Sequence, residues 1–492
     1  MAGTAPQHSR RRPRRWTLWG AATLVVVSGA TTGVVTVASA DDGRKAPTAD
    51  APDFNGDGYG DLAVGAPETT VAGAKEAGQV TVHWGGPDGP GNGQREAVRQ
   101  GRAGVPGTAE KGDRFGASVD TADVNGDGYT DLVVGSPGEE HGAEGRGIVT
   151  VVWGGDGGLD GATTVTKDVA PYGHLGGAVI ARDFDGDGAV DVAFDSHTEE
   201  SGGLAYVSGP LKPGGKPQPA RKIARLSMGG EVARLAAGDF NGDGTPELAA
   251  TAGAMDVPST GVYDWVKGKP EHLWGMANHG SSVAAGDFDG DGLDDLAVGG
   301  CRVTEEPGRC GEGESLGGRV HLLFGSRDEL GDRTQTVDQD TPGLPGGATR
   351  DDAFGASLAA RDTDGDGRAE LAVGSPGKAV GSQREAGQVF VLYGGGNGLL
   401  DSSGRARSTF FHQDTHPVPG NAEAEDVFGA AVELRDLNQD GAPELLVGAP
   451  GENEDTGGVW VLPGGAEGPR SEGSVALRPG AGVSRFGEVL AG

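Results

Sequence analysis

Acidic residues recur in this chain at a spacing that could hold a metal ion. A nine-residue pattern, Asp-x-Asx-x-Asp-Gly-x-x-Asp/Glu, begins at seven positions: Asp53, Asp123, Asp183, Asp239, Asp287, Asp362 and Asp436. Side chains at positions 1, 3, 5 and 9 and the carbonyl at position 7 would form an oxygen-only shell, and the glycine at position 6 permits the sharp turn. Calcium is favoured over magnesium because flexible, carboxylate-rich shells suit the larger ion.

The pattern assigns five candidate calcium ligands to each of these metal loops. In chain order they are Asp53, Asn55, Asp57, Tyr59, Asp61, Asp123, Asn125, Asp127, Tyr129, Asp131, Asp183, Asp185, Asp187, Ala189, Asp191, Asp239, Asn241, Asp243, Thr245, Glu247, Asp287, Asp289, Asp291, Leu293, Asp295, Asp362, Asp364, Asp366, Arg368, Glu370, Asp436, Asn438, Asp440, Ala442 and Glu444. Loops with Asn at position 3 hold three carboxylates, and those beginning at Asp183, Asp287 and Asp362 hold four. Such crowding predicts up to seven structural Ca²⁺ ions and poor order in empty loops. Acidic hairpin turns without metal are the alternative.

The loops do not have the organisation of EF-hands. An EF-hand needs a bidentate Glu at position 12 and flanking helices. Position 12 is apolar in every loop and lies in an expected strand: Val64, Val134, Phe194, Ala250, Val298, Val373 and Val447. We therefore expect each loop to join two strands and to close with the acid at position 9.

The segments around the loops repeat as well. A short apolar run such as residues 62–67 follows each loop, and then come a variable polar loop and an alternating segment that ends at glycine, such as residues 80–85. Phe-Gly and another short apolar segment stand upstream, as in residues 115–119. Each unit therefore predicts about four short strands, and no segment shows a helical period.

These paired signatures resemble the FG-GAP repeat family, which builds the β-propeller of integrin α chains. The resemblance covers residues 53–492 and implies an all-β, seven-bladed β-propeller with a calcium loop in each blade. It is carried by Phe115-Gly116 with Gly135-Ser136-Pro137, Phe354-Gly355 with Gly374-Ser375-Pro376, and Phe428-Gly429 with Gly448-Ala449-Pro450. Units three to five depart from it, with Leu175-Gly176, Met228-Gly229 and His279-Gly280 in place of Phe-Gly. Their metal loops are intact, so the departures concern blade packing more than calcium binding.

The two ends of the repeat region complement each other. The first unit starts at its metal loop without an upstream Phe-Gly strand, whereas residues 486–492 are a Phe-Gly strand without a loop. We therefore expect the C-terminal strand to complete the first blade and close the ring.

Composition and charge exclude several classes of protein. Glycine occupies 95 of 492 positions, proline 28, and hydrophobic residues make up 35%. Two kinds of chain would fit these numbers: a fold of short strands with many turns, and a disordered chain. The regular repeats exclude disorder. The net charge of −32 repels phosphate backbones and anionic membranes, so no nucleic-acid partner is expected.

The N-terminus has the anatomy of an export signal. Two arginines, Arg14 and Arg15, precede the apolar residues 16–37, and Ala38-Ser39-Ala40 fits a signal-peptidase site. We therefore interpret residues 1–40 as a signal peptide, 41–52 as a linker and 53–492 as the propeller. An uncleaved membrane anchor is the alternative, and the Sec and Tat export routes both remain open.

The functional expectation is a secreted, calcium-binding recognition or adhesion module, integrin α-like and non-catalytic. It would be a monomer, not held in a membrane after signal cleavage, and its variable loops would bind an extracellular protein or glycan. Cys301 and Cys310 are predicted to form a local disulfide, with two free thiols as the alternative. No catalytic constellation is found in the sequence. The alternative functions are a secreted hydrolase of the FG-GAP-containing type and a structural cell-surface scaffold.

Overall fold

The computed structural model describes residues 51–91, 93–102, 104–140, 147–165, 174–198, 201–216, 219–225, 231–254, 257–277, 280–300 and 317–491. These residues belong to one compact unit, Lys45–Gly492. The predicted signal peptide, most of the linker and the predicted Cys301–Cys310 disulfide lie outside the described residues.

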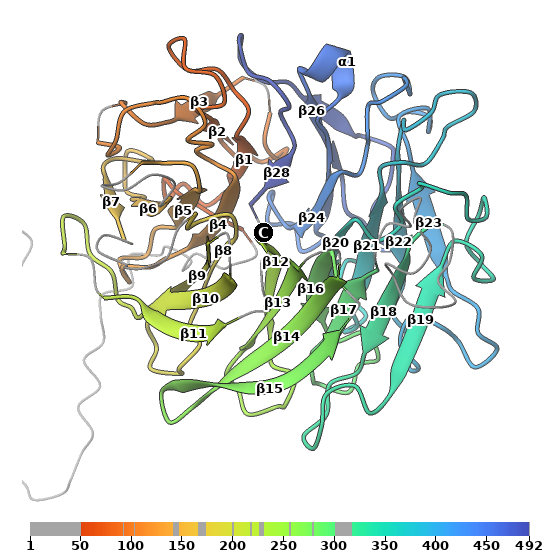
Figure 1. The fold of residues 1–492 in the computed structure, drawn as a ribbon. Helices are drawn as coiled ribbons and strands as arrows, with labels where there is room; N and C mark the ends of the chain where they lie inside the picture. Colours follow the sequence, from red (N-terminus) through yellow and green to blue (C-terminus); the bar gives the residue numbers. More distant parts are fainter. Residues whose placement is uncertain are drawn as a thin grey trace, which may run out of the picture. The chain divides into compact units, whose positions relative to one another are not determined.

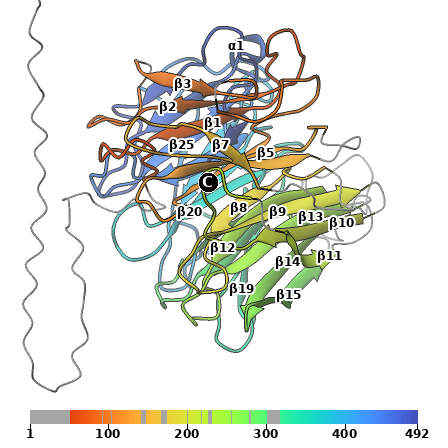
Figure 2. The same ribbon diagram turned by 90° about the vertical axis from the view of Figure 1, so that its left-hand side faces the viewer.

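The described chain folds into seven four-stranded antiparallel sheets arranged in a ring, which makes it an all-β, seven-bladed β-propeller (Figures 1 and 2). Within each blade, strands that follow one another in the sequence lie side by side. The innermost strands of neighbouring blades contact one another around the centre of the ring.

The strands are short, as the repeats predict. From the centre outward, blade one contains β28 (Val489–Leu490), β1 (Leu62–Ala66), β2 (Gln79–His83) and β3 (Arg95–Val98). Blade two contains β4 (Ser118–Ala122), β5 (Asp131–Ser136), β6 (Ile148–Val152) and β7 (Ala162–Thr164). Blade three contains β8 (Val179–Arg182), β9 (Asp191–Thr198), β10 (Ser201–Val207) and β11 (Arg221–Arg225). Blades four and five contain β12 (Glu231–Gly238), β13 (Glu247–Ala254), β14 (Val257–Val266) and β15 (Lys269–Ala277); and β16 (Ser282–Gly286), β17 (Asp295–Gly299), β18 (Arg319–Leu323) and β19 (Thr334–Asp338). Blades six and seven contain β20 (Ser357–Arg361), β21 (Glu370–Ser375), β22 (Gln388–Leu392) and β23 (Ser408–Phe411); and β24 (Ala431–Arg435), β25 (Glu444–Ala449), β26 (Gly458–Leu462) and β27 (Val475–Leu477).

The C-terminal strand completes the first blade, which confirms the predicted ring closure. β28 pairs antiparallel with β1, Val64 opposite Leu490 and Gly65 opposite Val489. In blade two the ordinary inner strand pairs in the same way, with Val119 opposite Val134. The terminal strand therefore occupies the position that an inner strand holds in the other blades.

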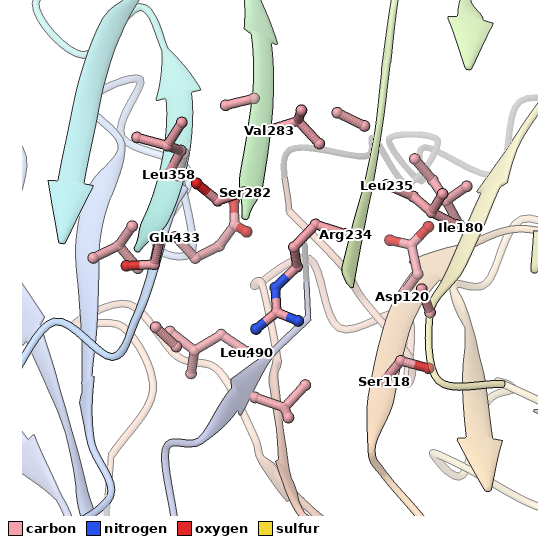
Figure 3. A pocket seen from close by; sticks show the side chains of 18 of the residues that line it. Ser118, Asp120, Ile180, Arg234, Leu235, Ser282, Val283, Leu358, Glu433 and Leu490 are labelled. Atoms are coloured by element: carbon pink, nitrogen blue, oxygen red, sulfur yellow. The ribbon is translucent and has the colours of Figure 1, made fainter. Parts of the chain in front are cut away.

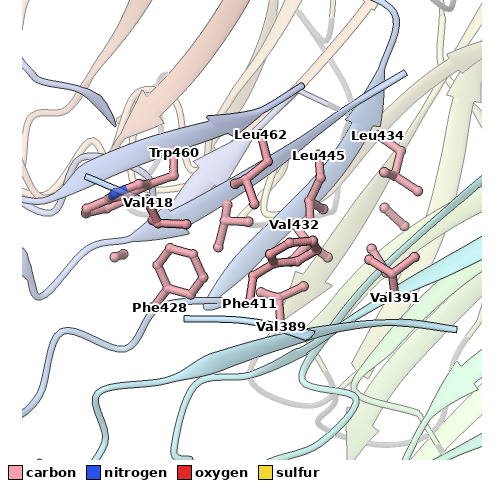
Figure 4. Close-up of a cluster of buried hydrophobic side chains, with 14 of the residues drawn as sticks. Val389, Val391, Phe411, Val418, Phe428, Val432, Leu434, Leu445, Trp460 and Leu462 are labelled. Atoms are coloured by element: carbon pink, nitrogen blue, oxygen red, sulfur yellow. The ribbon is translucent and has the colours of Figure 1, made fainter. Parts of the chain in front are cut away.

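The hydrophobic core lies between the blades. Between blades six and seven, Phe428 packs edge-on against Trp460, with ring centroids 5.5 Å apart, among aliphatic side chains of β22, β25 and β26 (Figure 4). The phenylalanines of the Phe-Gly pairs are fully buried at 0% exposure: Phe115, Phe354, Phe428 and Phe486. Burial of large apolar side chains is the main favourable term in folding, so these residues hold the blades together.

Phe-Gly and Gly-Ala/Ser-Pro occur together because they touch across a blade boundary. A Cβ atom added to Gly374 of blade six would lie 2.1 Å from the carbonyl oxygen of Gly429 in blade seven, far inside van der Waals contact. Next to this contact, Gly387 forms a parallel bridge with Phe428. Only a residue without a side chain permits this approach of the two backbones.

Two features of the fold differ from the simplest expectation. In blades three and four the middle hairpins are long: β9 and β13 each have eight residues, against five or six in the second strands of the other blades. The sequence also predicts no helix, whereas a short helical turn, α1 (Glu452–Asp455), follows β25. Two of its residues, Asn453 and Glu454, have positive φ angles, so it is a tight turn and not a regular helix.

Candidate metal centres

In blades two to seven the metal loop joins the innermost strand to the second strand, as in the segment between β4 and β5, and in blade one the loop directly precedes the second strand, β1. Neighbouring strands of a blade are antiparallel, so this connection lies at the same end of every blade. The seven loops therefore lie on one rim of the propeller, which we call the metal rim. The connections between second and third strands lie on the opposite rim, which we call the variable rim.

The seven loops share one backbone-to-carboxylate arrangement. The aspartate at position 1 accepts a hydrogen bond from the N–H at position 6, at 2.8–3.0 Å in every loop. The aspartate at position 5 accepts one from the N–H at position 7, at 2.9–3.1 Å. The loop backbone thus curls around its own carboxylates, which are brought together on one side.

The acid at position 9 fixes the base of each loop. It accepts a hydrogen bond from the N–H at position 2, at 2.7–3.3 Å in every loop. Where position 9 is aspartate, the second oxygen accepts the N–H of the glycine that follows the third strand, as with Asp61 and Gly85 at 2.8 Å. The same contact joins Asp131 to Gly154, Asp191 to Gly209 and Asp295 to Gly325.

Burial raises the pKa of every position-9 acid. The carboxyl of Asp131 reaches a pKa of about 8, although backbone N–H groups of Gly154 and Val124 oppose the rise. The other pKa values are about 7 for Asp61, about 6 for Asp191, about 8 for Glu247, about 7 for Asp295, about 7 for Glu370 and about 7 for Glu444. Desolvation is the largest cause in each case, and the other acids of the loop add to it. A bound cation would relieve both effects by favouring the ionised form.

The loops differ in how closely they gather their acids. In four of them, three carboxylates place oxygens within 4.8 Å of one another: Asp183, Asp185 and Asp191; Asp239, Asp243 and Glu247; Asp287, Asp289 and Asp291; Asp362, Asp364 and Glu370. All three loops with aspartate at position 3 belong to this group. No such trio occurs in the loops of blades one, two and seven, all of which the structure describes.

The donor set of these loops fits calcium. Each loop supplies side-chain oxygens without nitrogen or sulfur ligands, and position 3 is carboxylate or amide. Hard divalent cations prefer oxygen donors, and a flexible shell rich in carboxylates suits calcium. The positions 1, 3, 5 and 9 would hold the ion with their side chains, and position 7 with its carbonyl.

The metal loops also take part in contacts between blades, which the sequence did not predict. The carbonyl at position 1 of one loop accepts the N–H at position 8 of the next: Thr130 to Asp53 at 3.0 Å, and Ala369 to Asp287 at 2.7 Å. At the closing boundary, Gly60 of blade one donates to Leu437 of blade seven at 2.7 Å. A change in a metal loop would therefore reach the neighbouring blade.

Two arginines that lie beside the metal loops were also not predicted from the sequence. Arg333 forms an ion pair with Asp289 of blade five, and Arg407 lies 3.8 Å from Asp364 of blade six. Both aspartates occupy position 3. The arginines stand 44 and 43 residues after their partners, in segments without any repeated motif, so no signal in one sequence points to them.

The centre of the ring contains a cavity of about 360 Å³, lined by the innermost strands (Figure 3). Its charged side chains are largely paired within the protein: Arg182 lies 3.0 Å from Asp120, and Arg435 lies 3.4 Å from Glu433. Arg234 projects into the same cavity, where Glu488 also contributes to the lining and interacts with its charge. Internal compensation of this kind stabilises the centre of the ring and does not single out a ligand.

Six segments of the chain match the FG-GAP repeat family: residues 47–83, 115–152, 232–262, 279–300, 354–392 and 428–462. Among curated proteins, phosphatidylinositol-glycan-specific phospholipase D of Rattus norvegicus is 35% identical over 121 residues, which cover 23% of this chain and 14% of that protein. Integrin alpha-7 of Rattus norvegicus is 33% identical over 141 residues, which cover 28% of this chain and 11% of that protein. Each match therefore spans less than a sixth of the relative's length.

A solved structure of a protein from Lactobacillus plantarum aligns with 88% of this chain and 98% of its own, at 9% identity and a TM-score of 0.42. That score is too low to bear on fold or function. In the part of the chain that the structure describes, no helix has the length and apolar character needed to cross a membrane.

Proposed function

We propose that this chain, a seven-bladed β-propeller with six segments that match the FG-GAP repeat family, is a calcium-stabilised recognition module that acts outside the cell. In this proposal residues 1–40 direct export, the metal rim holds the calcium ions, and the variable rim binds an extracellular protein or glycan. The activities of its relatives are not transferred, because the matches cover only small parts of them.

One observation carries this proposal: the two rims of the propeller are organised differently. The metal rim repeats one hydrogen-bonded loop in all seven blades, which suits a common structural task. On the variable rim, twelve residues separate β21 from β22 in blade six and eight separate β25 from β26 in blade seven, whereas two separate β9 from β10. Loops that vary on a rigid scaffold are typical of binding surfaces.

Calcium would act as a structural ion in this module. When bound, it would offset two of the negative charges of one loop and join its two ends. The protein contributes the preformed turn, the position-9 acid, which in four loops accepts the N–H of the glycine after the third strand, and the contacts to the neighbouring blade. Binding to the folded state alone would raise stability with free calcium concentration.

Calcium binding is tested by removing the metal. The purified chain is treated with EDTA and titrated with calcium while its melting temperature is recorded, and bound calcium is counted by elemental analysis. We expect a rise in melting temperature and a stoichiometry up to seven. No bound calcium together with an unchanged melting temperature would contradict the structural role.

Recognition is tested with two variants of blade six. Residues 380–384 on the variable rim are replaced by Gly-Ser-Gly-Ser-Gly, and in a second variant Asp362 and Asp366 are changed to Ala. Both are screened against a glycan array and against immobilised extracellular matrix proteins. The loop variant should lose ligand binding and keep calcium uptake, whereas the second should lose stability before affinity. Loss of ligand binding in the second variant at full stability would place the ligand on the metal rim.

A further inference from the structure

The three loops with a fourth carboxylate share a feature that the other loops lack. Position 3 is aspartate in blades three, five and six and asparagine in the other four blades. In each of these three blades, an arginine from the outermost strand or the residue just before it interacts with that aspartate. The extra negative charge thus coincides with a positive charge from a distant part of the same blade.

Blades five and six build this pair in the same way. The carbonyl of Arg333 accepts the N–H of Phe324 at 3.1 Å, and that of Arg407 accepts the N–H of Tyr393 at 3.0 Å. The guanidinium carbon of Arg333 lies 3.4 Å from the centre of the Phe324 ring, and that of Arg407 lies 4.1 Å from the centre of the Tyr393 ring. The aromatic ring therefore supports the arginine on one side by a cation–π contact.

The other side of each arginine faces its metal loop. Arg333 forms an ion pair with Asp289, and Arg407 lies 3.8 Å from Asp364. The side chains of the two aspartates are only 7% and 9% exposed, whereas those of the arginines are 50% and 60% exposed. A nearly buried carboxylate thus meets a guanidinium that water can still reach.

Blade three shows a variation on the same arrangement. Burial raises the pKa of the Asp185 carboxyl, and the positive charge of Arg221 opposes that rise. Arg221 begins β11 and also hydrogen-bonds to Tyr206. The arginine again combines contact with an aromatic residue and attraction to the aspartate at position 3.

The blades with asparagine at position 3 have no arginine at the position of Arg333, and Arg95, which begins β3 of blade one, donates a hydrogen bond to the carbonyl of Arg478. The corresponding residues of blades one and two are Gln94 and Gly161, whose carbonyls accept the N–H groups of Trp84 and Trp153. Blade four has Glu271, opposite Asp264. In blade seven the two residues before β27, Gly473 and Ser474, are uncharged.

We propose that Arg333 and Arg407 are resident counter-ions that stabilise the metal-free loops of blades five and six and lower their affinity for calcium. The inference rests on the proposed calcium binding. At the ligand positions alone, the four carboxylates of blade five and Arg333 sum to −3, the same charge as the ligand positions of a loop with asparagine at position 3. Asp294, at position 8, adds one negative charge outside the ligand set. A dication entering either loop meets a fixed positive charge, which offsets the attraction of the fourth carboxylate.

Blade six carries one further positive charge. Arg368, at position 7, lies 3.0 Å from Asp366. The loop of blade six should therefore bind calcium more weakly than that of blade five. In both blades the loop should stay ordered at calcium concentrations that leave the loops of blades one, two and seven empty.

The test compares Arg333→Gln/Arg407→Gln with the wild-type full chain in calcium titrations by calorimetry and in thermal unfolding after EDTA treatment. We expect two sites to tighten by about tenfold, because a charge within a few ångströms of the ion is removed at a partly hydrated site. The metal-free melting temperature should fall. Arg350→Gln is the control for charge, since Arg350 is exposed in the connection between β19 and β20, away from the loops.

Two further variants separate charge from packing. Arg333→Lys/Arg407→Lys should retain most of the wild-type behaviour, and Asp289→Asn/Asp364→Asn added to the glutamine variant should restore the metal-free melting temperature. Unchanged affinities and an unchanged metal-free melting temperature in the glutamine variant, with calcium still bound, would overturn this inference alone. If wild-type protein binds no calcium, both the inference and the proposed function fail.

Discussion

Blades six and seven differ from blades three and four in the length of their second strands and in how the next blade packs against them. Blades six and seven have second strands of six residues that end at Gly-Ser/Ala-Pro, and the next blade packs onto that glycine. Blades three and four extend their second and third strands into long hairpins. The metal loops are nonetheless alike in all four blades. The two ends of a blade can therefore vary independently, because one strand length separates them.

The boundary contacts explain what replaces the missing motif in blade three. Asp195 stands where blades one, two, six and seven have the glycine of Gly-Ala/Ser-Pro, and its carboxylate accepts N–H groups of Gly176 and Ala178 at 2.9 and 3.1 Å. The glycine of the Phe-Gly pair is kept as Gly176, against which Gly135 of blade two packs. A polar contact within the blade thus takes over where the apolar motif is lost.

Removal of the closing strand β28 should have the largest effect, and it acts at a boundary of the kind found between blades six and seven. Deletion of residues 486–492 removes β28 and the fully buried Phe486, and it leaves the edge of β1 unpaired. Loss of a buried phenylalanine side chain alone typically costs about 3–5 kcal/mol. We expect a poorly soluble chain or a melting temperature lower by more than about 10 °C, measured by calorimetry.

Deletion of Gly492 alone is the control, since it leaves Val489, Leu490 and the hydrogen bond from Ala491 to Ala63 in place. A melting temperature equal to that of the full chain after the longer deletion would show that β28 does not hold the ring closed.

Calcium removal should affect both types of blade. Each loop that holds calcium at about 100 times its dissociation constant gains about 2.7 kcal/mol from binding. Hydrogen exchange with and without EDTA should therefore show faster exchange at the metal loops of blades three and four as well as those of blades one and seven. Protection that changes only in blades with the Phe-Gly motif would mean that hairpin type and metal binding are linked.

Substitution of a glycine at a blade boundary should destabilise the contact between blades six and seven. Gly374→Ala places a methyl group 2.1 Å from the carbonyl oxygen of Gly429, so the boundary between blades six and seven must open. Overpacking of this kind costs about 1–3 kcal/mol, measured by denaturant unfolding.

Gly396→Ala is the matched control, because a Cβ atom there would have no neighbour within 4 Å. Equal stability of the two variants would contradict the role given to the contact between the glycines.

The pH dependence of the metal-free protein should be the smallest effect. The position-9 acids have folded-state pKa values of about 6 to 8, above the value of about 4 expected in the unfolded chain. Their contribution to stability is complete below pH about 4 and is lost as pH rises through 6 to 8. With EDTA present, the melting temperature should fall by a few degrees between pH 5 and 8.

Calcium should reverse this trend, because it binds the ionised loops. A metal-free melting temperature that rises over the same range would show that these carboxylates ionise readily in the folded protein.

Local sequence was enough to predict the repeats, the loops and the closing strand. The metal pattern occupies nine consecutive residues, and the motifs that resemble the FG-GAP family stand close to it. The structure confirms seven blades of four strands and the pairing of β28 with β1. These features follow from turn chemistry and strand alternation, which act over a few residues.

Contacts between distant segments could not be predicted. Asp61 accepts the N–H of Gly85 across 24 residues, and Arg333 meets Asp289 across 44. Phe324 precedes Arg333 by nine residues, whereas Tyr393 precedes Arg407 by 14, so the spacing is not constant. The long hairpins of blades three and four were likewise not foreseen, because strand continuation depends on the whole sheet.

The pairing of β28 with β1 also makes one blade a mechanical seam. In the other six blades every strand is adjacent in the sheet to the strand that precedes or follows it in the sequence, but here two residue pairs link segments more than 400 residues apart. A force that pulls residues 51 and 491 apart acts on this short ladder first, and the remaining blades would carry load only after it has opened. The same ladder is the contact of longest range in the fold, so it can form only when the seven inner strands already surround the centre.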